Sequence, residues 1–232
     1  MWEIKLHPEV EAWFLDLCGT DPLTADLVSE AIDLLGEHGP ALGRPLVDRL
    51  RGSAFHHMKE LRPGSTGATE VRMIFAFDRL REAVFLVAGD KSGQWQSWSP
   101  DGHPLGGRPI SGAPHQLEGR PAMTDGLNWR DVKAKVRKVD PTWDEPDRVA
   151  RRAHLREQML ASVSGAQLAE IRKQLGMTQT QLAEAAGLSQ ARISQIENGE
   201  STNLETLRAY VTGLGGHLDV VARIGNIQLN VA

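Results

Sequence analysis

A short pattern of apolar and small residues in the last third of the chain constrains the fold more than any other feature. Leu182 and Ala183, then Gly187, then Ile193 and Ile196 have the spacing of two short helices that meet at a tight turn. The small Ala183 permits close approach of the helices, and Gly187 tolerates the positive φ that such a turn needs. The sequence therefore predicts a helix-turn-helix, whose second helix buries a thin stripe and exposes its other face.

The ends of the helices in this region are also marked. Ser164, Thr178 and Thr202 are each followed three positions later by Gln or Glu, as in a capping box, so helices are expected to begin there. The first should end at Gly176, and the last should run over residues 203–214. The apolar residues expected to be buried are Leu168, Ile171 and Leu175 in the first helix and Leu204, Leu207 and Val211 in the last.

The helix expected over residues 189–197 has an exposed face suited to reading DNA bases. Glutamine can make paired contacts with adenine, arginine with guanine, and alanine can touch a thymine methyl group. An ordinary helical hairpin would also carry polar residues on its wet side, but the joint spacing of the apolar residues and glycine favours DNA reading. The residues on this face are Gln190, Ala191, Arg192, Ser194 and Gln195.

The stretch LGMTQTQLAEAAGLSQARISQIENGE resembles the helix-turn-helix of the Cro/repressor (XRE-type) family. The resemblance covers about 50 residues and implies operator DNA as the partner. It implies that Gln179 contacts phosphate and that Gln190, Ala191 and Gln195 face base edges. Arg192 and Ser194 could reach either.

After residue 216 the spacing of the apolar residues changes from that of a helix to that of a strand. Residues 217–224 mostly alternate between apolar and polar, as in a short strand. A strand at the end of a small helical domain needs an edge to pair with. We hypothesise that it pairs with its own copy in a second subunit, giving a homodimer that reads a palindromic site. The apolar residues on one side of the strand are Leu218, Val220, Ala222 and Ile224.

The composition of the 232 residues is that of a soluble globular protein, with 41% hydrophobic and 24% charged residues. No apolar run is long enough to span a membrane, and residues 1–3 do not begin a signal peptide, so we expect a cytoplasmic protein. The single cysteine, Cys18, cannot form an internal disulfide and is expected in the core. The net charge of −4 does not decide function, since basic sites can be local.

The first part of the chain predicts a small α+β domain. Residues 2–6 alternate as a strand, and helices follow from Pro8 to about Cys18 and from Asp21 to Glu37. The order strand, two helices and then further strands predicts two helices against a curved, mainly antiparallel sheet. The later strands are expected at residues 47–50, 58–62, 70–78 and 83–88.

Four cations on or just beyond these strands could line the concave face of the sheet: Lys59, Arg62, Arg72 and Lys91. From composition alone, a set of solvated strand faces is the simpler interpretation. No set of histidines and cysteines has the spacing of a metal site, and no glycine loop suits a phosphate-bearing cofactor, so neither metal nor cofactor is expected.

The stretch from His38 to Trp95, HGPALGRPLVDRLRGSAFHHMKELRPGSTGATEVRMIFAFDRLREAVFLVAGDKSGQW, resembles toxins of the RelE/HigB type. Such toxins cleave mRNA on the ribosome without a metal, while basic side chains stabilise the phosphate charge. The resemblance implies that Arg72 stabilises the phosphate and that Lys91 assists, with Lys59 and Arg62 as less certain members. The position expected to transfer a proton holds Asp90.

The resemblance to toxins ends after Trp98, because the expected tyrosine and closing helix are absent. Residues 99–122 are rich in glycine and proline, as in a linker, and Met123 would be an old antitoxin start. We interpret the chain as a toxin gene and an antitoxin gene joined in one frame. The expected parts are a toxin domain (1–98), a linker (99–122), a helical antitoxin-like connector (123–163) and an all-α helix-turn-helix domain with a short strand (164–232).

The connector includes a basic helix from about residue 147, with four arginines: Arg148, Arg151, Arg152 and Arg156. It could be a solvated face, a clamp on the acidic toxin-like half, as antitoxins of this class imply, or a contact to DNA phosphate.

The sequence as a whole favours a DNA-binding regulator of a toxin–antitoxin system that represses its own promoter. The alternative is a ribosome-dependent, metal-independent mRNA endoribonuclease restrained by its fused antitoxin half, with ribosome and mRNA as partners. A third interpretation makes the toxin half a purely structural body for dimerisation or tethering.

Overall fold

The computed structural model describes residues 1–50, 58–67, 69–78, 80–92, 126–225 and 227–230. It divides the chain into two compact units, Met1–Met159 and Leu160–Ala232, and the division falls inside helix α4 (Pro146–Gln174). The expected linker, residues 99–122, lies outside the described residues. Among the described residues, no helix is long and apolar enough to cross a bilayer.

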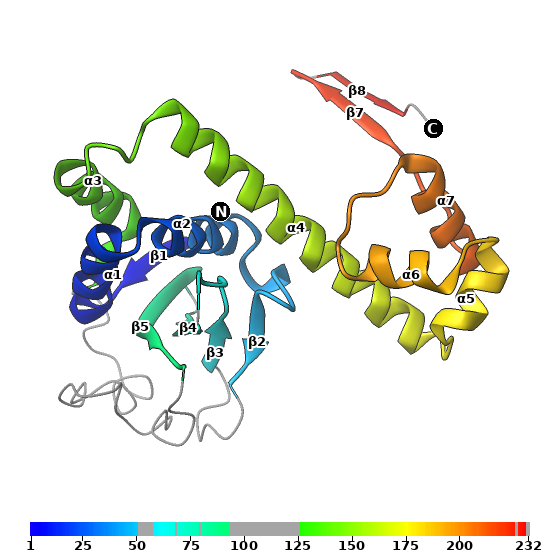
Figure 1. Ribbon diagram of the computed structural model, residues 1–232, viewed down its shortest axis with the longest axis horizontal. Helices are drawn as coiled ribbons and strands as arrows, with labels where there is room; N and C mark the ends of the chain where they lie inside the picture. The colour runs from blue at the N-terminus through cyan, green and yellow to red at the C-terminus, as the bar shows by residue number, and fades with distance from the viewer. Residues whose placement is uncertain (51–57, 68, 79, 93–125, 226, 231–232) are drawn as a thin grey trace. The chain divides into compact units, whose positions relative to one another are not determined.

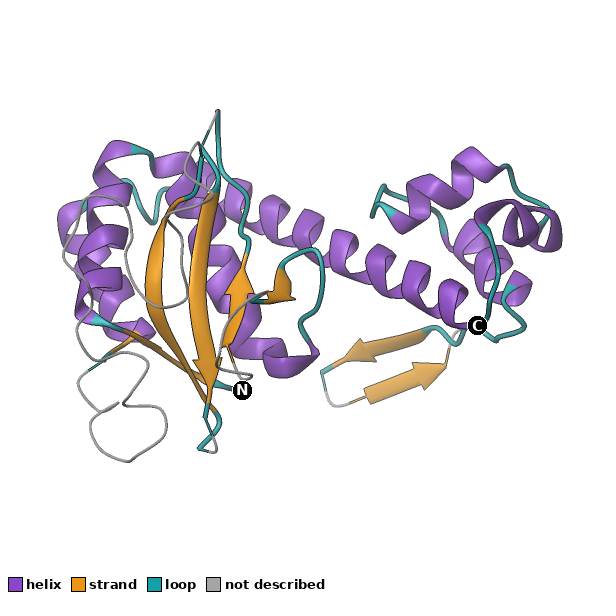
Figure 2. Ribbon diagram, turned by 90° about the horizontal axis from the view of Figure 1, so that it is seen from below, coloured by secondary structure: helices purple, strands orange, loops and turns teal. Residues whose placement is uncertain are grey.

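The first unit is built on a six-stranded sheet in the order β2-β3-β4-β5-β1-β6. Figures 1 and 2 show this sheet with the helices of the unit beside it. β1 and β5 pair in parallel, and all other neighbours pair antiparallel, so the expected mainly antiparallel sheet is confirmed. The strands are β1 (Glu3–Leu6), β2 (Val47–Arg49), β3 (Met58–Leu61), β4 (Val71–Phe77), β5 (Glu82–Asp90) and β6 (Leu127–Asn128).

Two helices, α1 (Pro8–Thr20) and α2 (Pro22–His38), pack on one face of this sheet and are followed by the short helix η1 (Gly39–Ala41). Proline suits the first turn of each helix because the amide hydrogen that it lacks would have no partner there. Asp21 caps α2 by accepting from the Thr24 backbone N–H. The core between helices and sheet is fully buried and includes Phe14, Ile32, Leu35, Met73, Phe75 and Phe85.

The other side of α2 is buried as well, although it carries acids. Asp26 is 0% exposed and Glu30 is 8% exposed. The cover comes from α3 (Trp129–Val139) and the first part of α4, and β6 adds an edge strand beside β1. Because these elements follow the expected linker, the chain's later part completes the first unit.

The second unit contains the expected helix-turn-helix. The last part of α4 is followed by α5 (Gln179–Ala186), α6 (Gln190–Glu197) and α7 (Leu204–Gly213). A hairpin of β7 (Val221–Ile224) and β8 (Ile227–Asn230) follows. The core of this unit consists of Leu182, Ala183, Ile193, Ile196 and Tyr210, with Leu168, Met177, Leu188 and Leu214 packed against it.

Several local expectations for this unit were wrong. No helix begins at Ser164, because the residues before it are already helical and α4 continues through them. α7 is capped by Asn203 rather than Thr202. The strand expected over residues 217–224 forms only from Val221 and pairs with β8 of the same chain.

The buried face of the last part of α4 also differs from the expected one. It follows Gly165, Leu168 and Arg172, so Ile171 (46% exposed) and Leu175 (55%) face outward. Leu204 of α7 is likewise 45% exposed. An apolar repeat gives the period of a helix but not which stripe the neighbouring helices cover.

Candidate DNA-binding and cation sites

The turn between α5 and α6 has the geometry that a recognition helix needs. The capping box of Thr178 and Gln181 is present at the start of α5. Gly187 ends α5 in the left-handed region, with φ of 66°, and Ser189 caps α6 by accepting from the Arg192 backbone N–H. α5 and α6 begin within one residue of the predicted starts, and the glycine turn lies where the sequence predicted it.

The predicted reading face of α6 is accessible. Gln190 and Ala191 are exposed, and Arg192, Ser194 and Gln195 are half-buried. The opposite stripe, Ile193 and Ile196, is buried at 0% and 3% exposure. The six residues predicted to contact DNA therefore lie in one continuous part of the unit, with Gln179 at the start of α5.

Beneath this face, the buried carboxylate of Glu197 links side chains from neighbouring helices. Glu197 accepts from Arg172 Nε at 2.6 Å and Nη2 at 2.8 Å, and from the Tyr210 hydroxyl at 2.9 Å. Gln179 Nε2 donates to the same carboxylate at 2.9 Å. Burial raises the pKa of Glu197, but these hydrogen bonds outweigh it and hold the pKa below its ordinary value.

Arg192 is held against the loop before α7. Its guanidinium donates to Gln195 Oε1 at 3.0 Å and to Thr202 Oγ1 at 2.9 Å. Two of the predicted DNA contacts, Arg192 and Gln195, therefore touch each other, and the arginine is oriented before any ligand arrives.

The structure brings three of the four predicted toxin cations together around one buried glutamate. Arg62 Nη2 lies 2.8 Å from Glu60 Oε2, and Arg72 Nε and Lys91 Nζ lie 3.4 and 3.6 Å from Glu60 Oε1. Glu60 is 3% exposed. Arg72 also pairs with Glu70, and Arg62 with Asp48. The cations are thus already matched by carboxylates.

Lys59 does not belong to this cluster. It precedes Glu60 on β3, and neighbouring residues of a strand point to opposite faces. Its Nζ lies 5.4 Å from the centre of the Phe77 ring. Burial and the charge of Arg49 lower the pKa of Lys59. The expected grouping of four cations is therefore wrong for this residue.

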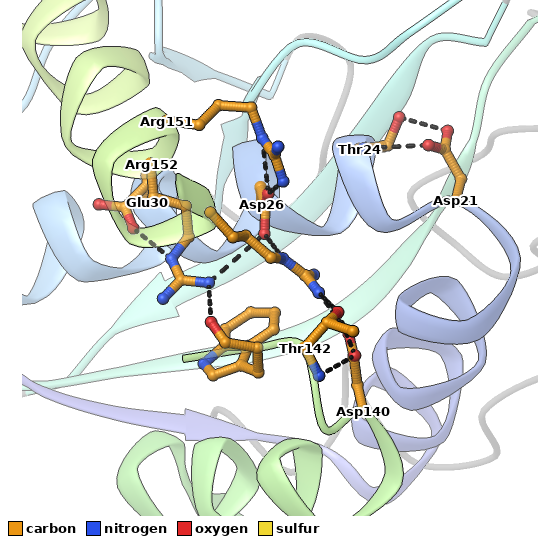
Figure 3. A network of polar contacts seen from close by, with 10 residues as sticks. Asp21, Thr24, Asp26, Glu30, Asp140, Thr142, Arg151 and Arg152 are labelled. Atoms are coloured by element: carbon orange, nitrogen blue, oxygen red, sulfur yellow. Dashed lines mark hydrogen bonds and ion pairs between the residues drawn. The ribbon is translucent and has the colours of Figure 1, made fainter. Parts of the chain in front are cut away.

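The arginines at the start of α4 form a clamp on α2 (Figure 3). Arg148 Nε and Arg151 Nη2 each lie 2.8 Å from an oxygen of Asp26, and Arg152 Nη1 lies 3.6 Å away. Arg148 also donates to Thr142 at 3.0 Å. Hydrogen bonds from Thr142 and Arg148 hold the pKa of Asp140 below its ordinary value, although burial alone raises it. Of the three interpretations of the basic helix, the clamp is the one observed.

Aromatic packing accompanies the ion pairs. Trp143 is 2% exposed, and the guanidinium groups of Arg148 and Arg152 lie 4.7 and 4.4 Å from its ring centre. Phe14 of α1 packs edge to face against Trp129, at 5.1 Å between ring centres, and against Trp143, at 6.4 Å. The two tryptophans of the connector thus extend the core of the toxin-like part.

Sequence reasoning missed the acidic half of this clamp. Asp26, Glu30, Asp33 and Glu37 recur at helical spacing and form one stripe along α2. Arg156 pairs with Glu30 at 3.6 Å and with Glu37, and Lys133 pairs with Asp33 at 2.8 Å. The signal was present as two stripes of opposite sign, on the expected helix 21–37 and on the basic helix.

Comparison with protein families agrees with both parts of the chain. A family described as "Helix-turn-helix" matches residues 168–221. A family described as "Phage derived protein Gp49-like (DUF891)" matches residues 16–102.

Relatives in Mycobacterium tuberculosis carry toxin and antitoxin names. Toxin HigB2 is 55% identical over 89 residues, 38% of this chain; the chain spans only 43% of its length. Toxin HigB3 is 47% identical over 102 residues, 44% of this chain and 84% of that protein. Antitoxin HigA3 is 44% identical over 109 residues, 44% of this chain and 93% of that protein.

A solved structure described as "DNA bound antitoxin HigA3" is 48% identical over 28% of this chain and 86% of that chain, with a TM-score of 0.26. One polypeptide matches both toxin HigB3 and antitoxin HigA3 over most of their length, whereas it spans less than half of toxin HigB2. The chain belongs to the HigB and HigA toxin–antitoxin families, joined in one protein, and is a DNA-binding regulator of a toxin–antitoxin system.

Proposed function

We propose that the chain binds an operator in its own promoter as a homodimer and represses transcription. The observation that carries the proposal is the recognition helix α6, which exposes Gln190 and Ala191 while its opposite stripe is buried. Polar side chains on such a face read base edges in the major groove.

The test is an anisotropy titration of the full chain against its own upstream DNA, at fixed salt and with random DNA of equal length as competitor, because the phosphate contribution to binding depends on salt. We expect specific binding whose preference for the operator over random DNA is reduced in Gln195→Ala. Affinity no better than for random DNA would contradict the proposal.

The homodimer is supported by the hairpin of β7 and β8. Four of its apolar side chains are 40–66% exposed: Val221, Ile224, Ile227 and Leu229. Exposed apolar strands are prone to pair or pack with another copy. A dimer by light scattering at micromolar concentration, converted to a monomer by Ile224→Lys with Ile227→Lys, is the expected result. A monomeric wild-type chain would contradict the proposed homodimer.

A second candidate function is metal-independent mRNA cleavage by the toxin-like part, held in check by the arginine clamp. The convergence of Arg62, Arg72 and Lys91 favours it, since such a group suits the charge of a phosphorane-like transition state. Ribosome-dependent mRNA cleavage that is lost in Arg72→Ala would support it. Absence of cleavage by a full-length Arg151→Ala/Arg156→Ala variant, which weakens the clamp but keeps the buried pair of Asp26 and Arg148, would count against it.

A further inference from the structure

The buried Glu197 carboxylate is an acceptor with a fixed polarity. An ionised carboxylate accepts hydrogen bonds and donates none. Its neighbours Arg172 and Tyr210 donate to it, which favours the charged form. Glu197 is 8% exposed, so water does not replace these partners.

This polarity is passed along two glutamines toward the surface. Since Glu197 Oε2 only accepts, Gln179 must turn its Nε2 toward it, at 2.9 Å. Gln179 Oε1 then points away and accepts from Gln190 Nε2 at 2.7 Å. The Gln179 amide has one orientation that satisfies both Glu197 and Gln190, because a flipped amide would set acceptor against acceptor at Glu197. Gln190 must then turn Nε2 toward Gln179, since its Oε1 there would face another acceptor.

Glu197, Gln179 and Gln190 thus form a hydrogen-bond relay, and its last member, Gln190, is exposed. One hydrogen of its Nε2 is used by Gln179, which leaves the second hydrogen and the Oε1 lone pairs unassigned among these contacts. A donor beside an acceptor matches N7 and the N6 amino group of adenine. Guanine offers two acceptors, N7 and O6. The opposite amide orientation would turn Gln190 Oε1 toward Gln179 and leave both Nε2 hydrogens to donate to these two acceptors.

We propose that Glu197 is a positioning residue for base recognition: through Gln179 it fixes the amide orientation of Gln190 and so selects adenine over guanine at one operator position. The proposal rests on the proposed operator binding. It also changes the role of Gln179, for which the family resemblance implies a phosphate contact. In the relay, Gln179 transmits base preference.

The test begins with duplexes selected by the wild-type full chain from a randomised pool, followed by substitution of each selected position. The new side chain in Glu197→Gln can donate as well as accept, so it no longer imposes one amide orientation on Gln179 and Gln190. We expect the adenine-over-guanine preference at the position read by Gln190 to fall at least about fivefold, the lower end for one paired base contact. Preferences at positions assigned to Gln195 should remain.

Tyr210→Phe is the matched control. It removes a hydrogen bond to the same carboxylate, but leaves its charge and the oxygen that accepts from Gln179. Stability should fall, while the adenine preference stays at the wild-type value. An equal loss of preference in Tyr210→Phe and Glu197→Gln would show a merely structural role and overturn the proposal.

A second variant, Gln179→Met, breaks the relay and removes one hydrogen bond to Glu197, but leaves the Glu197 charge and its ion pair with Arg172 in place. The proposal requires it to lose the same single-position preference, whereas equal weakening on every sequence would assign Gln179 to phosphate alone. Gln190→Ala tests the reading of the operator separately from the relay. If it leaves every preference unchanged, the proposed operator reading fails; if it removes one preference that Glu197→Gln retains, the relay alone fails.

Discussion

The carboxylate of Asp26 lies 2.8 Å from Nε of Arg148, although 122 positions separate the two residues in the sequence. Asp26 is 0% exposed and Arg148 is 5% exposed, so the pair is withdrawn from water. It joins the toxin-like helix α2 to the antitoxin-like helix α4, and two further arginines approach the same carboxylate.

Removing the Asp26 charge should destabilise the first unit. Asp26→Asn leaves a cluster of arginines without its counter-charge, and breaking a buried pair in this way costs about 3 to 5 kcal/mol. Glu37→Gln is the control, because the Glu37 side chain is 45% exposed and its ion pair should contribute at most about 1 kcal/mol. Urea unfolding followed by tryptophan fluorescence measures both, and equal effects of the two changes would contradict a buried clamp.

The helix-turn-helix unit should lose stability in acid. The pKa of Glu197 is lower in the folded state than its ordinary value of 4.5, so its contribution is complete above that value. The contribution is lost as the pH falls below 4.5 and through the folded pKa. Thermal unfolding of wild type and Glu197→Gln between pH 7 and 3 checks the sign. A difference between them that does not shrink toward acid would argue against the assignment.

A close approach in the second unit should make Gly165 intolerant of a side chain. A Cβ there would lie 2.5 Å from the Ile196 carbonyl oxygen and 2.7 Å from that of Glu197. Gly165→Ala should push α4 away from α6, lower the melting temperature and weaken binding to all DNA sequences. Gly187→Ala has open space but positive φ and should cost only about 1 kcal/mol. Similar melting temperatures for the two variants would refute this packing.

Base preference should depend on Gln195 in a position-specific way. Gln195→Ala removes a side chain of the α6 reading face and should reduce discrimination at one base pair by about 1 to 3 kcal/mol. The salt dependence of binding should stay the same, since no phosphate contact is lost. Titrations against single-position operator variants test this, and uniform weakening across them would remove Gln195 from the reading face.

Glu60 should hold the toxin-like cation cluster in place. Glu60→Gln leaves Arg62, Arg72 and Lys91 beside a neutral amide, so we expect a loss of about 3 kcal/mol or more in the free energy of unfolding. Glu70→Gln serves as control, because the Glu70 side chain is 31% exposed. If urea unfolding finds no greater loss for Glu60→Gln, the cluster does not depend on that carboxylate.

The sequence by itself determined the elements whose signals are local. The turn at Gly187, the cap at Thr178 and the buried pair Ile193 and Ile196 follow from short-range spacing, because a helix repeats every 3.6 residues and a tight turn selects glycine. The same reasoning found both parts of the chain and most strands of the first unit.

Only the tertiary structure decided which faces of those elements meet. The Asp26 clamp, the pairing of β6 with β1 and the relay from Glu197 to Gln190 join residues on separate elements. The repeat on α4 predicted a helix but not that Arg172, rather than Ile171, would face the core. The physical reason is that burial and charge pairing depend on what packs against an element, and a period carries no information about that partner.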